Sequence, residues 1–137
     1  MNIDDIKKEL IKLSNIAVKK GEVPISAVIV KNNKIISKAY NKVNKTNNIL
    51  DHAEIIAINK VSKKINNWRL NNCDLYVTLE PCSMCKEIIK KSRINNIYYF
   101  VKQNDNKTES NPNFTLLSNN NYFSDQLSLF FKNKRWL

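Results

Sequence analysis

The chain has 137 residues, of which 42% are hydrophobic and 26% are charged, and its 23 lysine and arginine residues outnumber 12 acidic ones for a net charge of +11. This composition is typical of a globular protein, and we expect one domain over residues 1–137 with its own hydrophobic core. No apolar run approaches the roughly 20 residues that a bilayer span requires, so no membrane association is predicted.

The positive charge is compatible with a polyanionic partner such as RNA, because lysine and arginine release counterions from phosphates. It is equally compatible with solvated surface lysines in a chain rich in lysine, asparagine and isoleucine, so charge alone leaves both interpretations open. Residues 1–9 do not have the pattern of a signal peptide, and three cysteines are not a dense disulfide framework. We therefore expect a reducing, cytoplasmic location.

The first part of the chain is predicted to form a helix and a hairpin. Over residues 4–20, aliphatic side chains recur at three- and four-residue steps, which indicates an amphipathic helix. Gly21, the only glycine, follows at the point where a helix end favours a left-handed residue. Two apolar runs, 25–30 and 34–39, are predicted to be antiparallel strands that turn on Asn32-Asn33.

The middle of the chain alternates helix and strand. Residues 41–48 are polar without periodicity and are predicted to be a loop. A second helix is expected over residues 51–63, with Asp51 as its N-cap. Residues 75–79 are β-branched or aromatic and predict a strand, and the proline that follows indicates a third helix over residues 81–91.

The last part of the chain gives weaker signals. Residues 97–101 predict a strand, residues 103–113 a polar loop and residues 114–117 a short strand. A basic C-terminal helix is expected at about 124–135 with Ser124 as its cap. Its apolar face would consist of Leu127, Phe130 and Phe131.

An initial hairpin followed by alternating helices and strands predicts an α/β protein, a three-layer α/β/α sandwich around a mixed five-stranded sheet. A sheet that is covered on both faces also explains the unbroken apolar runs that begin at Ile25 and Leu75. No internal repeat and no second domain are visible in the sequence.

The strongest chemical signal is a pair of thiols, Cys82 and Cys85, directly behind Pro81. The only histidine, His52, lies upstream with Glu54 two residues after it. Thiolate and imidazole are zinc ligands, and catalytic zinc sites use three protein ligands and leave the fourth position to water. His52, Cys82 and Cys85 are therefore candidate ligands for one Zn²⁺, and Glu54 is a candidate general acid/base that moves protons at that water.

Simpler explanations exist for each of these residues. The cysteine pair alone fits a redox dithiol, although that leaves His52 and Glu54 unexplained. Glu54 alone fits an acidic residue that a helix N-terminus favours, and Asn41 alone fits a turn residue after a strand. The remaining thiol, Cys73, is predicted to be a small core residue rather than a fourth ligand.

His-x-Glu followed by Pro-Cys-x-x-Cys is the signature of zinc nucleobase deaminases. The similarity covers roughly residues 3–102, with a weaker likeness at 130–135. On these residues, the chain resembles the wobble-adenosine deaminases within the cytidine/deoxycytidylate deaminase superfamily. The segments that carry the likeness besides the signature are Glu22-Val23-Pro24, Trp68-Arg69-Leu70, residues 75–80 and Ser92-Arg93-Ile94.

The resemblance implies a cytidine deaminase-like fold and a zinc-dependent hydrolase that converts adenosine to inosine at the wobble position of a tRNA anticodon. By the same resemblance, His52, Cys82 and Cys85 would hold one zinc ion per chain, Glu54 would be the general acid/base, and the protein would be a homodimer. The expected substrate contacts are Asn41, which would bond to the base, Ile25 and Ala53, which would line its pocket, and Phe131, Lys134 and Arg135, which would meet the anticodon loop.

The sequence also departs from that family. Ser26 stands where the family usually has glycine, Asp51 where it has a small residue, and residues 100–104 where it has a glycine-containing acidic loop. These departures affect how RNA would be held rather than the metal chemistry. Two alternatives stay open: a deaminase of a free nucleobase or nucleoside of the guanine or cytosine type, and a non-catalytic RNA-binding module stabilised by zinc.

Overall fold

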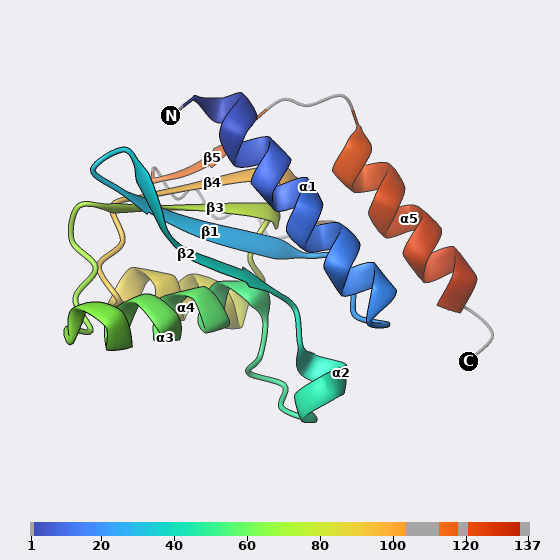
Figure 1. The fold of residues 1–137 in the computed structure, drawn as a ribbon, viewed down its shortest axis with the longest axis horizontal. Coiled ribbons are helices and arrows are strands. Elements are labelled where there is room, and N and C mark those ends of the chain that lie inside the picture. Colours follow the sequence, from blue (N-terminus) through green and yellow to red (C-terminus); the bar gives the residue numbers. More distant parts are fainter. Residues whose placement is uncertain (1, 104–112, 118–120, 135–137) are drawn as a thin grey trace.

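A computed structural model describes residues 2–103, 113–117 and 121–134 of the chain (Figure 1). Among these residues the strands form a five-stranded sheet in the order β2-β1-β3-β4-β5. The elements are α1 (Ile3–Lys19), β1 (Ser26–Lys31), β2 (Lys34–Tyr40), α2 (Val43–Thr46), α3 (Ala53–Ile65), β3 (Cys73–Leu79), α4 (Ser83–Lys91), β4 (Asn96–Val101), β5 (Phe114–Leu116) and α5 (Tyr122–Lys134).

The sheet is mixed and is covered on both faces. β1 runs antiparallel to β2 and β3, whereas β3, β4 and β5 run parallel to one another. Figure 1 shows α1 and α5 on one face and α3 and α4 on the other. Each face has its own cluster of buried apolar side chains, one including Leu75 and Ile89 and the other Leu10 and Phe123. The predicted α/β/α sandwich is therefore confirmed.

No helix in the described part of the chain is both long enough and apolar enough to cross a membrane. The longest, α1, spans 17 residues and is amphipathic, with its buried side recurring at three- and four-residue steps, as predicted. Its start is closed by a capping box, in which the Asn2 side chain accepts a hydrogen bond from the backbone N–H of Asp5 at 3.0 Å.

Left-handed backbone conformations are supplied mainly by asparagine. Gly21, at the end of α1, has φ +74°, as its position predicts. Asparagine tolerates this region better than other side chains because its short amide bonds to nearby backbone. The predicted hairpin turn on Asn32-Asn33 is confirmed. Among the described residues, the non-glycine residues with positive φ are Asn32, Asn33, Asn47, Asn66, Asn72, Asn121 and Arg93.

Ser26, which the resemblance places where the family usually has glycine, is fully buried at the start of β1. Its hydroxyl donates to the backbone oxygen of Leu10 at 2.7 Å and lies 2.8 Å from the hydroxyl of Ser14. Both partners belong to α1. The extra hydroxyl is thus satisfied by the helix that covers it, and this departure from the family has a local structural explanation.

The prediction of a loop over residues 41–48 is wrong, because residues Val43–Thr46 form the short helix α2. The helix is held by a tertiary contact that periodicity does not reveal. Glu22 is 1% exposed, and its carboxylate accepts hydrogen bonds from the backbone N–H groups of Asn44 at 3.0 Å and Lys45 at 2.8 Å. These bonds satisfy N–H groups that a helix start leaves unpaired.

Two predicted N-caps are also wrong. The N-cap of α3 is His52 rather than Asp51. α5 begins at Tyr122, two residues before Ser124, whose hydroxyl donates to the backbone oxygen of Asn121 at 3.0 Å inside the first turn. In α3 the residue with the better capping propensity, Asp51, lies one position before the observed N-cap.

α5 is anchored by a residue that the sequence analysis did not single out. Phe123 is 1% exposed and its ring centroid lies 5.2 Å from that of Phe100 on β4. Leu127 is buried, as predicted, whereas Phe131 is 56% exposed and Phe130 is half-buried. The predicted apolar face is therefore only partly buried, and Phe131 projects from it.

Candidate metal centre and active site

The candidate ligands lie at the starts of two neighbouring helices. His52 is the N-cap of α3 and Cys82 is the N-cap of α4, and both have extended backbone. An N-cap side chain usually bonds back to its own helix, but neither of these does. The imidazole and the thiol are therefore available to a ligand, and the N–H groups of both helix starts favour negative charge there.

The three predicted ligands come together. Nδ1 of His52 lies 3.8 Å from Sγ of Cys82 and 3.3 Å from Sγ of Cys85, and all three ligand atoms lie within 4.8 Å of one another. Tetrahedral zinc with bonds of about 2.0 Å to nitrogen and 2.3 Å to sulfur would separate such atoms by about 3.5 to 3.8 Å. The geometry and the donor set of one imidazole and two thiols both fit Zn²⁺.

Cys73 is not part of this group. It is the first residue of β3, is fully buried and belongs to the hydrophobic cluster beneath α3 and α4. Its prediction as a core residue is confirmed. Within the described residues, His52, Cys82 and Cys85 are the group of His, Cys, Asp and Glu side chains that could hold a metal ion.

Glu54 lies in the first turn of α3 and is 4% exposed. Burial raises the pKa of its carboxyl above the ordinary value, because desolvation penalises the charged form. A raised pKa makes the Glu54 carboxylate a stronger base, which suits the proton acceptance that a general base requires.

The hydrogen bond between the two thiols shifts their pKa values in opposite directions. The bond from Cys85 lowers the pKa of Cys82 to about 5, and the same pairing, together with burial, raises the pKa of Cys85. Because zinc binds thiolates, zinc binding at this group would release thiol protons.

A pocket opens over the ligand group. It includes three of the residues expected to contact substrate, Ile25, Asn41 and Ala53, and their contact with a substrate stays a prediction. Glu80 and Gln103 were missed by the sequence analysis. Glu80 adjoins Pro81 in the signature, but nothing in the sequence marks Gln103. The complete wall is Ile25, Asn41, His52, Ala53, Glu54, Leu79, Glu80, Cys82 and Gln103.

The side chain of Asn41 has a fixed orientation. Its backbone N–H donates to the oxygen of Ile25 at 3.0 Å, and its side-chain oxygen accepts from the N–H of Val43 at 3.0 Å. This second bond turns the amide oxygen toward α2. The NH₂ group of Asn41 is therefore the part of the amide that can serve a ligand, and it is a donor.

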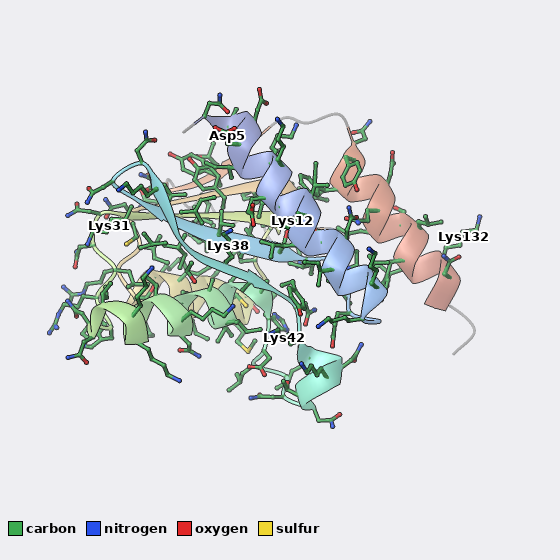
Figure 2. The ribbon with its side chains drawn as sticks, viewed as in Figure 1. Asp5, Lys12, Lys31, Lys38, Lys42 and Lys132 are labelled. Atoms are coloured by element: carbon green, nitrogen blue, oxygen red, sulfur yellow. The ribbon has the colours of Figure 1, made fainter. Side chains whose placement is uncertain are left out.

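The three residues expected to meet RNA are not in this wall. Phe131 is exposed on α5, Lys134 is the last residue of that helix, and Arg135 lies outside the described residues. Their role stays a prediction. Other cations lie on several elements: Figure 2 shows labelled lysines on α1, β1, β2 and α5. One of them, Lys42, follows Asn41, with its Nζ 5.0 Å from the ring centroid of Tyr40.

An α/β/α sandwich that joins a His-x-Glu helix start to a Pro-Cys-x-x-Cys helix start defines the class of zinc-binding deaminase folds. Comparison with known proteins agrees. The chain belongs to the cytidine and deoxycytidylate deaminase family, because the model of that family's zinc-binding region matches residues 2–101. The predicted family and the predicted zinc cofactor are both confirmed.

The chain is similar to proteins named tRNA-specific adenosine deaminase. The relative from Rickettsia bellii is 50% identical over 94 residues, which are 67% of this chain and 65% of that protein. The relative from Bacillus subtilis is 42% identical over 92 residues, 67% of this chain and 57% of that protein. The chain thus covers less than two thirds of these relatives. The relative from Buchnera aphidicola is 39% identical over an alignment of 143 positions, which covers 94% of this chain and 93% of that protein.

Two solved structures have the same fold at more than a quarter identity. One, from a study of A-to-I editing by tRNA:A34 deaminases at the wobble position of transfer RNA, is 28% identical with a TM-score of 0.73 and covers 81% of this chain and 95% of that one. The other, guanine deaminase from Bacillus subtilis, is 26% identical with a TM-score of 0.70 and covers 100% of this chain and 96% of that one.

Proposed function

We propose that the chain is a zinc-dependent hydrolase that deaminates adenosine to inosine at the wobble position of a tRNA anticodon. The observation that carries the proposal is that Glu54 interacts with a group of three candidate ligands, the one such group among the described residues, beside a pocket. A structural zinc site would use four protein ligands, whereas three leave a position for water. The relatives from Rickettsia, Bacillus and Buchnera support the choice of substrate.

The residues suit a hydrolytic deamination. Zinc held by His52, Cys82 and Cys85 would act as a Lewis acid that acidifies the attacking water. Glu54 would take one proton from that water and deliver it to N1 of adenine as the bond from oxygen to C6 forms. Glu54 would then carry the remaining hydroxyl proton to the amino group, so that the C6–N bond breaks and ammonia leaves inosine behind. The raised pKa of Glu54 favours its taking the proton from that water.

Asn41 would orient the base, with Ile25 and Ala53 as apolar walls. We expect Asn41→Ala to lower kcat/KM about fivefold, the value of one hydrogen bond of roughly 1 kcal/mol. Asn41→Asp keeps an oxygen for the N–H of Val43 but replaces the amide donor, so it should be worse than alanine. Steady-state kinetics on a tRNA anticodon stem-loop, with zinc content as control, measures both. An Asn41→Asp variant as active as wild type would contradict this role.

The RNA contact expected of Lys134 and Arg135 predicts a change in salt dependence. Binding of single-stranded RNA loses affinity with salt at a slope of about −0.7 per phosphate contact. Lys134→Ala combined with Arg135→Ala should therefore reduce the slope by about 1.4. Lys63→Ala with Lys64→Ala, at the end of α3, is the matched control and should leave the slope unchanged. Titrations of an anticodon stem-loop at several salt concentrations test this, and equal slopes for both double variants would refute it.

The substrate itself is tested by offering zinc-loaded protein a tRNA, free adenosine, guanine and cytosine in parallel. Inosine at the wobble position supports the proposal, and its absence with zinc bound sinks it. The likeness to guanine deaminase favours one alternative, turnover of a free base, which would appear as conversion of guanine alone. RNA binding without any conversion would indicate the non-catalytic module.

We further propose that the protein is a homodimer located in the cytoplasm, where its RNA substrate would be found. The resemblance to the wobble-adenosine deaminases supports the dimer. Light scattering coupled to gel filtration would measure its mass against that of the 16.0 kDa chain.

A further inference from the structure

We propose that Glu80 is a positioning residue, which fixes both the turn that carries Cys82 and the Gln103 wall of the pocket. The inference rests on the proposed function, because it concerns the same site. Glu80 lies at the end of β3, immediately before Pro81, and its residue exposure is only 9%. A carboxylate is rarely buried to this degree unless it is paired.

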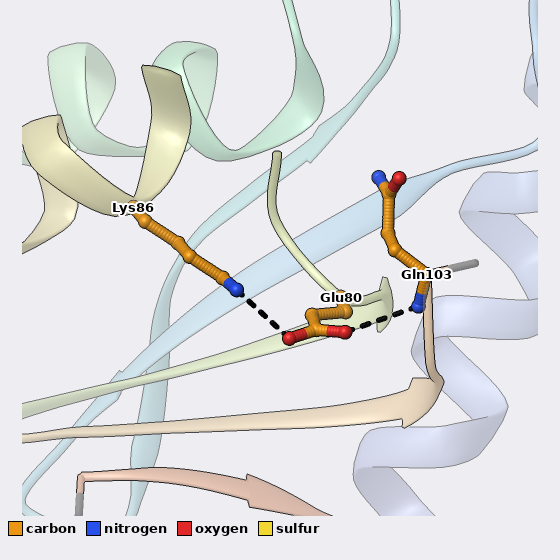
Figure 3. Close-up of polar contacts among 3 residues, drawn as sticks. All are labelled: Glu80, Lys86 and Gln103. Atoms are coloured by element: carbon orange, nitrogen blue, oxygen red, sulfur yellow. Dashed lines mark hydrogen bonds and ion pairs between the residues drawn. The ribbon is translucent and has the colours of Figure 1, made fainter. Parts of the chain in front are cut away.

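Both carboxylate oxygens of Glu80 are engaged by the protein (Figure 3). One accepts a hydrogen bond from Nζ of Lys86 at 2.9 Å and the other accepts from the backbone N–H of Gln103 at 3.1 Å. The side chains of Glu80 and Lys86 are each 11% exposed. One carboxylate thus joins three segments: the turn after β3, the first part of α4 and the residues after β4.

Lys86 closes the same turn from its other end. Its backbone N–H donates to the oxygen of Cys82 at 2.9 Å, while its side chain holds Glu80. Pro81, between them, has no N–H to contribute. Lys86 therefore binds the candidate metal ligand Cys82 through its main chain and binds Glu80 through an ion pair. Together these two contacts restrain the turn.

The second bond of the Glu80 side chain connects it to Gln103. The backbone N–H of Glu80 donates to the oxygen of Val101 at 2.7 Å, and the carboxylate of Glu80 accepts a hydrogen bond from the backbone N–H of Gln103. Glu80, Cys82 and Gln103 all line the pocket. Because both oxygens are occupied, Glu80 would act through these neighbours rather than by touching substrate.

The ion pair makes this arrangement sensitive to either partner. When one member of a buried pair is removed, the other charge loses its compensation and the local structure must shift. Residues that hold metal ligands in place typically change metal affinity or activity by about 10- to 100-fold when replaced. The Glu80 contacts should therefore be visible in metal retention as well as in turnover.

The first test is Glu80→Gln in the zinc-loaded protein, with two readouts: the rate of zinc release to a chromogenic chelator, and kcat and KM for an anticodon stem-loop. We expect zinc release to be about tenfold faster and KM to rise as the Gln103 wall loosens. The matched control is Glu87→Gln on α4, which removes a surface pair with Lys90 at 3.7 Å and should change neither quantity.

Lys86→Met gives a second, independent variant that keeps the bond from Glu80 to Gln103. It should also speed zinc release, and the double variant should be no worse than the worse single one, because the two act as a pair. A folded Glu80→Gln or Lys86→Met protein that releases zinc at the wild-type rate and keeps the wild-type KM would overturn the proposal. Since zinc release needs no RNA, it decides the matter even if wild-type protein proves inactive on tRNA.

Discussion

Replacing Glu54 with glutamine is expected to lower inosine formation by about 10²- to 10⁴-fold without loss of zinc. Glutamine has nearly the same shape as glutamate and can occupy the same place in the first turn of α3, but it cannot accept and release a proton. The measurement combines single-turnover conversion of an anticodon stem-loop with zinc content of the purified variant.

Two outcomes would contradict this role for Glu54. A glutamine variant that retains a tenth or more of the wild-type rate would show that another group moves the protons. A variant that loses its zinc would show that Glu54 holds the metal centre together instead. Melting curves recorded alongside would separate either result from a failure to fold.

The second large effect is expected from removing a zinc ligand. Cys85→Ala should abolish zinc binding at micromolar metal, eliminate turnover and lower the melting temperature, because a metal that binds only the folded state stabilises it. For a metal present at about 1,000 times its dissociation constant the loss is about 4 kcal/mol, on the order of 10 °C for a domain of this size.

Cys73→Ala is the matched control for the loss of a thiol. Cys73 is fully buried in the cluster beneath α3 and α4, away from the ligand group, so this variant should melt at a lower temperature yet keep its zinc and its turnover. The prediction for Cys85 would fail if its alanine variant bound zinc with the wild-type stoichiometry.

The candidate site could be predicted from the sequence because its residues occur in pairs that are close together along the chain. His52 with Glu54, and Cys82 with Cys85, are each separated by a few residues, so one helix start fixes each pair. The chemistry of zinc then joins the two pairs without knowledge of the fold. The structure adds that His52 and Cys82 are themselves N-caps, which explains how both point out of their helices.

The contacts of Glu80 could not be predicted in the same way. Gln103 is 23 residues further along the chain, and only the parallel register of β3 with β4, which pairs Leu79 with Val101, brings the two together. The same limit applies to α2, which depends on the distant carboxylate of Glu22, and to the packing of Phe123 on Phe100. The periodicity of apolar residues predicts individual helices and strands, whereas these contacts depend on how the helices and strands are arranged in the fold.

The asparagines with left-handed backbone lie outside the pocket wall, so they can be changed without changing the residues of the candidate site. Six of the seven non-glycine residues of this kind in the described chain are asparagine, and none of the seven lies in the wall of the pocket. Glycine adopts that conformation without the steric cost that a side chain incurs. A protein engineer could therefore exchange these asparagines for glycine one at a time and adjust heat tolerance, while the residues that hold metal and move protons stay untouched.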